Sequence, residues 1–271
     1  MPGEGPNALG PGVGEVRAAA RSGQLRPYFQ AVVDMKENPS VLGAESLLRW
    51  HHPRWGVLAA AQFLHLVEQA GLLVEVDLAS VEQLATDLSR LGDAGRCLER
   101  VWLNVSRGEL FADSFLKAVA SATQRVGLRG SRVGVEIPEE VLSADSTAVS
   151  RRLARVRSLG VGVTIDHFGL GLGLSHDLGG VPFDAVKLDR SLIARIDQSD
   201  ATRRAVAAAV AMAHASGAAV IAEGVERHSQ FHVLREIGCD GAQGYLFGKA
   251  VPIGDLLGHE DSAPPASLWW G

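Results

Sequence analysis

The sequence predicts a TIM-like (β/α)8 barrel with an antiparallel first strand, and three observations support this prediction. Six short apolar runs, rich in Val, Ile or Leu, each end in an acid or an amide. Most of these runs are separated by stretches with helical periodicity, as in parallel βα units. The first of these runs is instead preceded by another apolar run, and a short, turn-rich link joins the two, which favours an antiparallel hairpin. A length of 271 residues suits one such barrel, with two small domains as the weaker alternative.

The N-terminal part of the chain is expected to contain a disordered segment, a hairpin and two helices. Residues 1–23 are rich in Gly and Pro near the start, and we expect them to be disordered. The hairpin strands are Arg26–Val33 and Val41–Trp50. Apolar residues then recur at three- and four-residue spacing in Ala61–Ala70 and in Leu73–Leu91, which predicts two helices.

The middle of the chain is expected to alternate between strands and helices. Strands are predicted at Val101–Ser106 and Arg132–Ile137, because these runs are rich in β-branched residues. Helices are predicted at Glu109–Val126 and at Thr147–Leu159, and Gly160 is a typical stop signal for the second.

The last part of the chain continues this alternation. Its predicted elements, in chain order, are the strands Val161–Asp166 and Ala185–Asp189, the helix Ala201–Ser216, the strand Ala218–Val225, the helix Ser229–Ile237 and the short strand Asp240–Leu246. A Gly-rich segment follows the first of these strands. The barrel domain is therefore expected to span residues 24–257, with an irregular tail at 258–271.

Composition excludes several classes of function. The net charge of −5 argues against binding to a nucleic acid polymer. No apolar stretch reaches the roughly 20 residues needed to span a bilayer, and the N-terminus lacks the features of a signal peptide. Cys97 and Cys239 are far apart and are expected to be free thiols in a cytoplasmic protein.

Oxygen-bearing side chains mark the ends of the six apolar runs. They are Glu45, Asn104, Glu136, Asp166, Asp189 and Glu223. In a (β/α)8 barrel the C-terminal ends of the strands meet on the face that carries the active site. Carboxylate and amide oxygens are the donors that Mg²⁺ and Mn²⁺ prefer. The sequence therefore predicts a hard-metal site at this face, with Glu45, Asn104, Glu136 and Asp166 as its first ligands.

Seven short motifs occur in an order that resembles a known family. They are Glu45-Ser46-Leu47-Leu48-Arg49-Trp50, Asn104-Val105-Ser106, Glu136-Ile137-Pro138-Glu139, Asp166-His167-Phe168-Gly169, Lys187-Leu188-Asp189, Glu223-Gly224-Val225-Glu226 and Gln243-Gly244-Tyr245. This set resembles EAL domains, the bacterial cyclic-di-GMP-specific phosphodiesterases, over roughly Gln24 to Leu257. The resemblance implies a barrel of the predicted kind and metal-dependent hydrolysis of cyclic-di-GMP to pGpG. It also implies that a homodimer is one expected assembly.

The resemblance implies roles for the catalytic residues. The first metal is assigned to the four ligands already named, and a second to Asp166, His167 and Glu223. Two metals can supply the nucleophilic water and neutralise charge on the phosphoryl oxygens. Lys187 resembles the lysine that holds the attacking water, and Glu223 is the candidate general base. Asp189 and Glu226 would orient Lys187 and nearby waters.

The resemblance also implies four residues around the ligand. Arg49 resembles an arginine that grips a ligand phosphate, a contact for which the guanidinium group is well suited. Gln30 and Gln243 resemble amides that line the site, although Ala31 follows Gln30 where the family usually has a proline. Glu139 resembles the glutamate that braces the Gly-rich loop.

His167 is the main departure from the family pattern, because active members carry a second aspartate at this position. The imidazole is neutral, bulkier than a carboxylate and a poor ligand for Mg²⁺, although it suits softer metals. Three alternatives follow: His167 abolishes the second metal, it binds a softer metal, or it has little effect on activity. The loop that follows, Leu170–Leu174, has also lost the hydroxyl groups usual in the family.

These features leave three functions open. The first is a phosphodiesterase, of full or weak activity, that hydrolyses cyclic-di-GMP, and it is the preferred hypothesis. The second is a catalytically inactive domain that senses cyclic-di-GMP or docks to a protein. The third is an unrelated barrel enzyme acting on a phosphorylated metabolite, since a fold alone does not fix a function.

Overall fold

Eight strands form a closed barrel in the computed structural model, which describes residues 10–91, 98, 100–125, 133–143, 146–169 and 181–258. In chain order the barrel strands are β1 (Leu25–Asp34), β2 (Val41–His52), β4 (Arg100–Asn104), β5 (Val133–Pro138), β6 (Gly162–Phe168), β7 (Ala185–Leu188), β8 (Ala219–Ala222) and β9 (Gly241–Ala242). Strand β1 is antiparallel to both β2 and β9, whereas all other neighbours in the ring are parallel. The predicted barrel with an antiparallel first strand is therefore confirmed.

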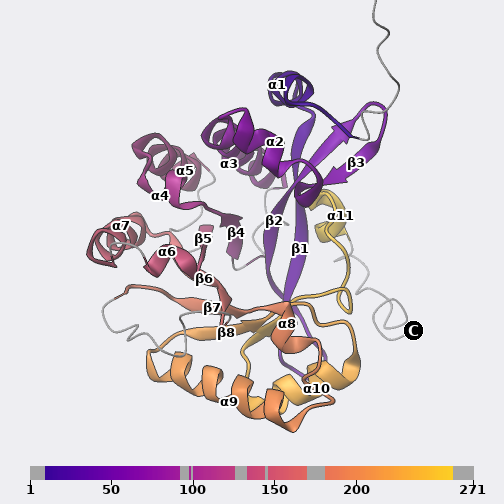
Figure 1. The fold of residues 1–271 in the computed structure, drawn as a ribbon, viewed down its shortest axis with the longest axis vertical. Coiled ribbons are helices and arrows are strands. Elements are labelled where there is room, and N and C mark those ends of the chain that lie inside the picture. The colour runs from indigo at the N-terminus through magenta and orange to yellow at the C-terminus, as the bar shows by residue number, and fades with distance from the viewer. Residues whose placement is uncertain are drawn as a thin grey trace, which may run out of the picture.

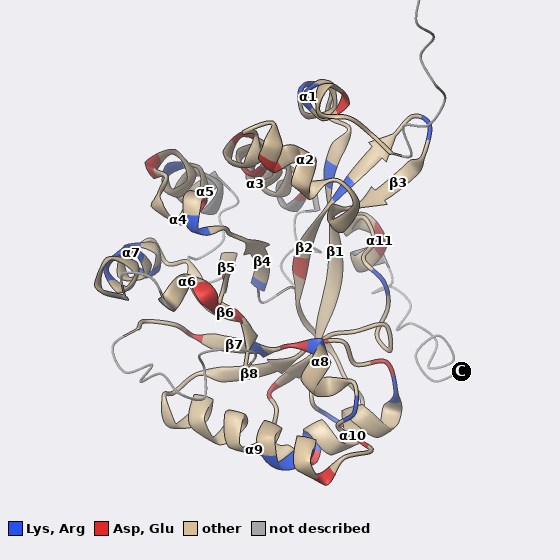
Figure 2. Cartoon of the chain, in the orientation of Figure 1, with Lys and Arg blue, Asp and Glu red and all other residues tan. Residues whose placement is uncertain are grey.

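Helices surround the ring of strands (Figure 1). The longer ones are α3 (Leu73–Leu91), α5 (Asp113–Arg125), α7 (Ser146–Ser158), α9 (Asp200–Ala215) and α10 (His228–Ile237). The shorter ones are η1 (Ala60–Gln62), α2 (Leu64–Gln69), α4 (Arg107–Phe111), α6 (Glu140–Ser143), α8 (Arg190–Ile193) and α11 (Ile253–Gly258). Figure 2 shows the strands mostly in tan, with charged residues concentrated on helices and loops. The main hydrophobic core lies between the strands and these helices.

Side-chain alternation along each strand fills the barrel interior in layers. On β7, Val186 and Leu188 belong to the outer core, so Ala185 and Lys187 face inward. Trp102 of β4 lies in the interior, where its indole N–H donates a hydrogen bond of 3.1 Å to Oγ1 of Thr164. A Cβ on Gly134 would lie 2.8 Å from this indole ring, so the glycine makes room for Trp102. This packed layer forms the floor of the site described below.

The expected disorder of residues 1–23 is wrong for α1 (Val13–Ser22). Val16 and Ala19 of this helix are completely buried against Trp50, Phe63 and their neighbours in a second hydrophobic cluster. The carboxylate of Glu15 accepts a hydrogen bond from the N–H of Gly12 and so caps the first turn. The many Gly and Pro residues just before this segment concealed its short amphipathic pattern. Residues 1–9 lie outside the described part of the chain.

Other elements also differ from the sequence predictions. Strand β3 (Gly56–Ala59) pairs antiparallel with the end of β2 and was not predicted, because its four residues offer too short a pattern. The helix expected at Glu109–Val126 is divided into α4 and α5, because Ala112 adopts an extended conformation. Strand β9 contains two residues, far fewer than the run predicted at Asp240–Leu246.

Several other expectations fall outside the described residues. They are the loop Leu170–Leu174, most of the tail at 258–271, and Cys97. Cys239 is free and buried, and burial raises the pKa of its thiol to about 12. Among the helices that the structure describes, none has both the length and the apolar character required to cross a membrane.

Candidate active site

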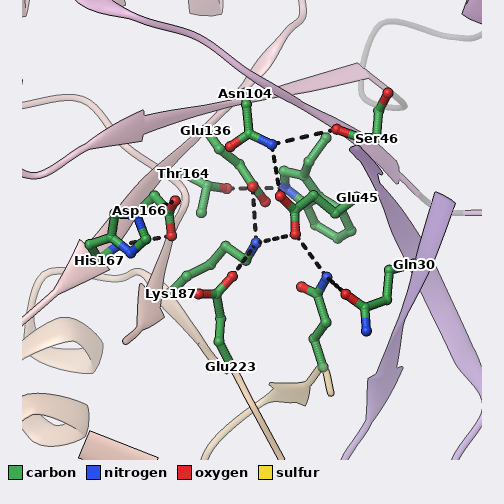
Figure 3. Close-up of polar contacts among 12 residues, drawn as sticks. Gln30, Glu45, Ser46, Asn104, Glu136, Thr164, Asp166, His167, Lys187 and Glu223 are labelled. Atoms are coloured by element: carbon green, nitrogen blue, oxygen red, sulfur yellow. Dashed lines mark hydrogen bonds and ion pairs between the residues drawn. The ribbon is translucent and has the colours of Figure 1, made fainter. Parts of the chain in front are cut away.

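The inward-facing residues at the C-terminal ends of the strands converge on one cluster (Figure 3). Its members are Glu45 on β2, Asn104 on β4, Glu136 on β5, Asp166 on β6, Lys187 on β7 and Glu223 directly after β8. The parallel strands place their ends on the same face, as the sequence analysis expected. The structure thus brings these polar residues together, and their roles at the site stay predictions.

Lys187 lies at the centre of the cluster and its side chain is fully buried. Its ammonium group is 3.0 Å from Oε2 of Glu45, 2.9 Å from Oε2 of Glu136 and 2.5 Å from Oε1 of Glu223. Burial alone would lower the pKa of Lys187, but the surrounding carboxylates outweigh burial and hold this pKa well above its usual value. Lys187 therefore remains a cation inside the barrel.

The three carboxylates around Lys187 have unequal environments. Burial raises the pKa of Glu136 well above its usual value and also raises the pKa of Glu223, despite the opposing charge of Lys187. Burial acts in the same direction on Glu45, but the charge of Lys187 and hydrogen bonds from its neighbours outweigh it, so the pKa of Glu45 is lowered. The cluster therefore combines one firmly ionised carboxylate with two that hold protons more readily.

Two amide side chains hold Glu45 in place. Nδ2 of Asn104 donates to its Oε1 at 2.7 Å, and Nε2 of Gln243 donates to its Oε2 at 2.8 Å. Gln243 also donates to Oε1 of Gln30 at 3.1 Å, and Gln30 donates to the carbonyl of Gly248. Both glutamines therefore lie at the site, where the resemblance placed them.

The donor set fits a divalent cation. Oε1 of Glu136 is buried and has no hydrogen-bond partner among the described residues, and such a buried oxygen is costly unless something binds it. The carboxylates of Glu45, Glu136, Asp166 and Glu223 outnumber the single positive charge of Lys187, so the site can still attract a cation. Glu45, Asn104, Glu136 and Asp166 supply the carboxylate and amide oxygens that hard metals prefer. A second group of donor atoms, from Asp166, His167 and Glu223, lies within 4.8 Å of one another.

His167 occupies an irregular position on β6. The pairing of β6 with β7 is shifted between Ile165 and Phe168, which is the pattern of a β-bulge. His167 has a φ of 55°, the only positive φ of a non-glycine residue in the described part of the chain. This left-handed conformation costs on the order of 1 kcal/mol for a residue with a Cβ. Such strain is most often found at functional sites.

The structure corrects the expected role of Asp189. Its Oδ1 accepts a hydrogen bond of 2.8 Å from the N–H of Ser191 and so caps α8. Its Oδ2 lies 3.2 Å from Nδ1 of His167, and no hydrogen bond joins it to Lys187 within the described residues. Burial opposes its ionisation, but the bonds from Ser191 outweigh burial and lower the pKa of Asp189. Asp189 therefore positions His167 instead of Lys187.

The remaining predicted residues lie around this centre. Oε2 of Glu139 accepts a hydrogen bond of 3.3 Å from the N–H of Gly169, at the start of the loop it was expected to brace. Glu226 lines the cavity. The guanidinium of Arg49 donates to the carbonyl of Leu48 and lies over the ring of Tyr28. Arg49 is not among the cavity-lining residues in the described part of the chain, so its contact with a phosphate stays a prediction.

A cavity of about 700 Å³ lies over the cluster. Its walls combine the site residues Glu45, Asp166 and Glu223 with Glu68 of α2 and Asp77 of α3. This volume falls within the range of pockets that hold drug-sized ligands. The site can therefore bring a ligand of this size against the carboxylates.

Glu109 also lines this cavity and was not recognised from the sequence as a site residue. It is 2% exposed, and its Oε1 has no hydrogen-bond partner among the described residues. Its Oε2 accepts a hydrogen bond of 2.6 Å from the N–H of Ser106 in the capping box of α4. The Ser-x-x-Glu spacing could have revealed this cap, but burial depends on the fold. Burial raises the pKa of Glu109 to about 7.

The Glu109→Gln variant is expected to change how stability depends on pH. Between the ordinary pKa of 4.5 and the folded-state pKa of about 7, the folded protein binds more protons at Glu109 than the unfolded chain does. The free energy of unfolding therefore falls as pH rises through this window, by at most roughly 3 kcal/mol. Glutamine can retain the capping box but cannot ionise, so this contribution should vanish.

Urea unfolding of wild type and variant between pH 4.5 and 8 measures this difference. The variant should gain stability relative to wild type as pH rises. Glu236→Gln, at an exposed carboxylate on α10, is the matched control and should follow the wild-type profile. Parallel profiles for Glu109→Gln and wild type would contradict the prediction.

Comparisons with known proteins identify the family of this chain. The model described as "EAL domain" matches residues 13–250. The cyclic di-GMP phosphodiesterase NbdA of Pseudomonas aeruginosa is 34% identical over 256 residues, which are 93% of this chain and 33% of NbdA. The cyclic di-GMP phosphodiesterase RocR of the same organism is 30% identical over 92% of this chain and 63% of RocR. This chain thus spans about a third of NbdA and less than two thirds of RocR.

The solved structures agree with this assignment at the level of the fold. The structure titled "PaMucR Phosphodiesterase, c-di-GMP complex" has a TM-score of 0.83 and 29% sequence identity to this chain. The match covers 90% of this chain and 98% of that one. The cluster at the strand ends is therefore the candidate active site within this shared fold.

Proposed function

Because this chain belongs to the EAL domain family, we propose that it binds cyclic di-GMP in the strand-end cavity and hydrolyses it to pGpG. The observation that carries this proposal is the buried ammonium of Lys187 among the carboxylates of Glu45, Glu136 and Glu223, beside a cavity of about 700 Å³. The relatives named as cyclic di-GMP phosphodiesterases support both the substrate and the reaction.

A divalent cation is part of this proposal, with Mg²⁺ or Mn²⁺ at the first position. Glu45, Asn104, Glu136 and Asp166 would hold it, and the unpartnered Oε1 of Glu136 supports this assignment. Such a cation, when bound, polarises a phosphoryl oxygen and lowers the pKa of water. Rotation of the Asn104 amide would exchange its Nδ2 for its Oδ1 as the group directed toward the site.

The side chains of this protein would then perform the proton and charge transfers. Lys187 stays protonated and stabilises the negative charge that develops on the phosphoryl oxygens. Glu223 accepts the proton of the attacking water, since burial raises its pKa and a raised pKa suits a general base. The water oxygen bonds to phosphorus, the bond from phosphorus to the 3′ oxygen breaks, and that oxygen leaves with a proton from solvent. The 5′ phosphate remains on pGpG.

Binding of cyclic di-GMP without hydrolysis is a second candidate function. It is favoured by His167, which replaces an anionic carboxylate with a neutral imidazole in the group formed with Asp166 and Glu223. An inactive domain of this kind would still retain the cavity and the first metal ligands. It would act as a sensor or as a docking module.

One assay separates these candidates. Purified protein is incubated with cyclic di-GMP in EDTA, Mg²⁺ or Mn²⁺, pGpG is followed by chromatography, and binding is measured by calorimetry. Binding with metal-dependent release of pGpG is the expected result. Binding without release would favour the sensor, particularly if the His167→Asp variant gained turnover. The absence of both binding and release would overturn the proposed function.

A cytoplasmic location and a homodimeric state complete the proposal. The buried free thiol of Cys239 supports a reducing compartment, where free thiols persist. Light scattering of the purified protein measures the oligomeric state directly.

A further inference from the structure

We propose that the second metal position, made by Asp166, His167 and Glu223, takes a divalent transition-metal ion through the imidazole of His167 and discriminates against Mg²⁺. The donor atoms of these three residues lie within 4.8 Å of one another. This inference deepens the proposed function, because it assigns the metal class at the same active site. Three features of the chain support it.

The first feature is the backbone at the end of β6. Successive residues of a regular strand point to opposite faces of the sheet, so Asp166 and His167 would ordinarily face apart. The bulge between Ile165 and Phe168, with a φ of 55° at His167, interrupts this alternation. Both Asp166 and His167 consequently line the cavity, while Phe168 returns to the outer core. The backbone therefore delivers two adjacent ligands to one site.

The second feature is the orientation of the imidazole. Oδ2 of Asp189 lies 3.2 Å from Nδ1 of His167, and a carboxylate accepts the Nδ1–H of a neutral ring at this distance. Nε2 then carries no proton, and its lone pair is available to bind a metal. A carboxylate that fixes the other ring nitrogen is the usual arrangement behind a histidine that binds a metal. Asp189 thus prepares Nε2 as a ligand.

The third feature is the separation of the donor atoms. Nε2 of His167 lies 3.5 Å from Oδ2 of Asp166 (Figure 3). Two atoms that each bind one metal at about 2.0–2.2 Å, with octahedral or tetrahedral angles, lie about 2.8–3.6 Å apart. Oδ1 of Asp166 is meanwhile fixed by a hydrogen bond of 2.8 Å from the N–H of His167. The pair is therefore spaced for one shared ion.

Ligand chemistry determines which ion this is. Two carboxylates balance the charge of a divalent cation, and the third ligand is a nitrogen. Imidazole binds Zn²⁺, Co²⁺ and Fe²⁺ well, whereas Mg²⁺ prefers oxygen donors throughout. The first group, Glu45, Asn104, Glu136 and Asp166, offers oxygen only. The two positions should therefore differ in metal preference.

Titration of metal-free protein with Co²⁺ tests this proposal without measuring activity. A histidine bound to Co²⁺ gives a strongly shifted, exchangeable ring N–H signal in proton NMR, and visible absorption reports the coordination. We expect one such signal from wild type, and we expect it to persist in excess Mg²⁺. The His167→Gln variant should lose the signal, and its Co²⁺ affinity at this site should fall at least tenfold. The Asp189→Asn variant should weaken Co²⁺ binding by about tenfold to a hundredfold.

The control is His232→Gln, which alters an exposed histidine that lies 3.1 Å from Glu236 and should leave the signal unchanged. Circular dichroism of each variant verifies folding. Absence of the signal in wild type, its survival in His167→Gln, or its loss in excess Mg²⁺ would overturn the proposal. The His167→Asp variant should instead allow Mg²⁺ to compete with Co²⁺.

Calorimetry of cyclic di-GMP binding in EDTA distinguishes the failure of this inference from the failure of the proposed function. Co²⁺ coordination by His167 in a protein that does not bind cyclic di-GMP would support the metal site and overturn the function. Binding and hydrolysis of cyclic di-GMP with no dependence of Co²⁺ binding on His167 would overturn the metal site alone.

Discussion

Replacement of Lys187 by methionine is expected to destabilise the metal-free protein by about 3–5 kcal/mol near neutral pH, the range for removing one partner of a buried ion pair. The ammonium of Lys187 contacts three carboxylates, and the side chain of Glu136 is fully buried. Without Lys187 these carboxylates must either remain charged in a poorly solvated interior or bind protons. Methionine has roughly the volume of lysine, so most of the lost stability should come from removal of the positive charge and little from lost packing.

The pH dependence of this loss identifies its origin. Protonation neutralises Glu136 and Glu223, whose pKa values burial already raises, so the loss should be smaller at pH 5 than at pH 8. Urea unfolding in EDTA measures both values. The exposed Lys249, whose ammonium lies over the ring of Tyr245, provides the control Lys249→Met, expected to change stability by less than about 0.5 kcal/mol. A loss below about 1 kcal/mol for Lys187→Met would contradict a structural role for this cation.

The Glu45→Gln variant is expected to reduce hydrolysis of cyclic di-GMP by at least about a hundredfold. Glu45 is the carboxylate whose pKa is lowered in the cluster, and it would contribute a full negative charge to the first metal position. Glutamine has nearly the same shape but no charge. Loss of one charged or polar stabilising group in an active site typically costs about 10²–10³ in rate.

Single-turnover rates of pGpG formation, measured with saturating enzyme and Mn²⁺, test this expectation. Binding of cyclic di-GMP in EDTA should change little, because glutamine keeps the wall of the cavity intact. Glu236→Gln, at an exposed carboxylate on α10, should retain the wild-type rate. A Glu45→Gln variant with more than a tenth of the wild-type rate would show that Glu45 is not required for metal-dependent hydrolysis.

The sequence predicted the barrel well because its main signals are local. The alternation of apolar strands with amphipathic helices predicted the parallel part of the ring, and the short link after Val33 predicted the antiparallel hairpin. Weak local signals account for the errors. Helix α1 follows a Gly- and Pro-rich stretch, β3 has four residues, and the break at Ala112 between α4 and α5 has no distinctive residue.

The candidate site was likewise predicted in part from the sequence. The ends of the apolar runs identified Glu45, Asn104, Glu136 and Asp166 as neighbours, because parallel strands end on one face of a barrel. The central position of Lys187 among three carboxylates was not predicted, since it depends on closure of the ring. Asp189 was expected beside Lys187, but the helix α8 that it caps directs its second oxygen toward His167.

By itself, the sequence determined the fold, the family resemblance and the donor atoms available at the site, because each depends on residue type and on spacing along the chain. Only the tertiary structure decided which of these groups touch. Side chains from β2, from β5 and from the residue after β8 meet Lys187 only when the barrel closes, and burial strengthens the attraction between opposite charges there. The bulge at His167 likewise depends on the pairing of β6 with β7, because a strand's own sequence does not fix its register.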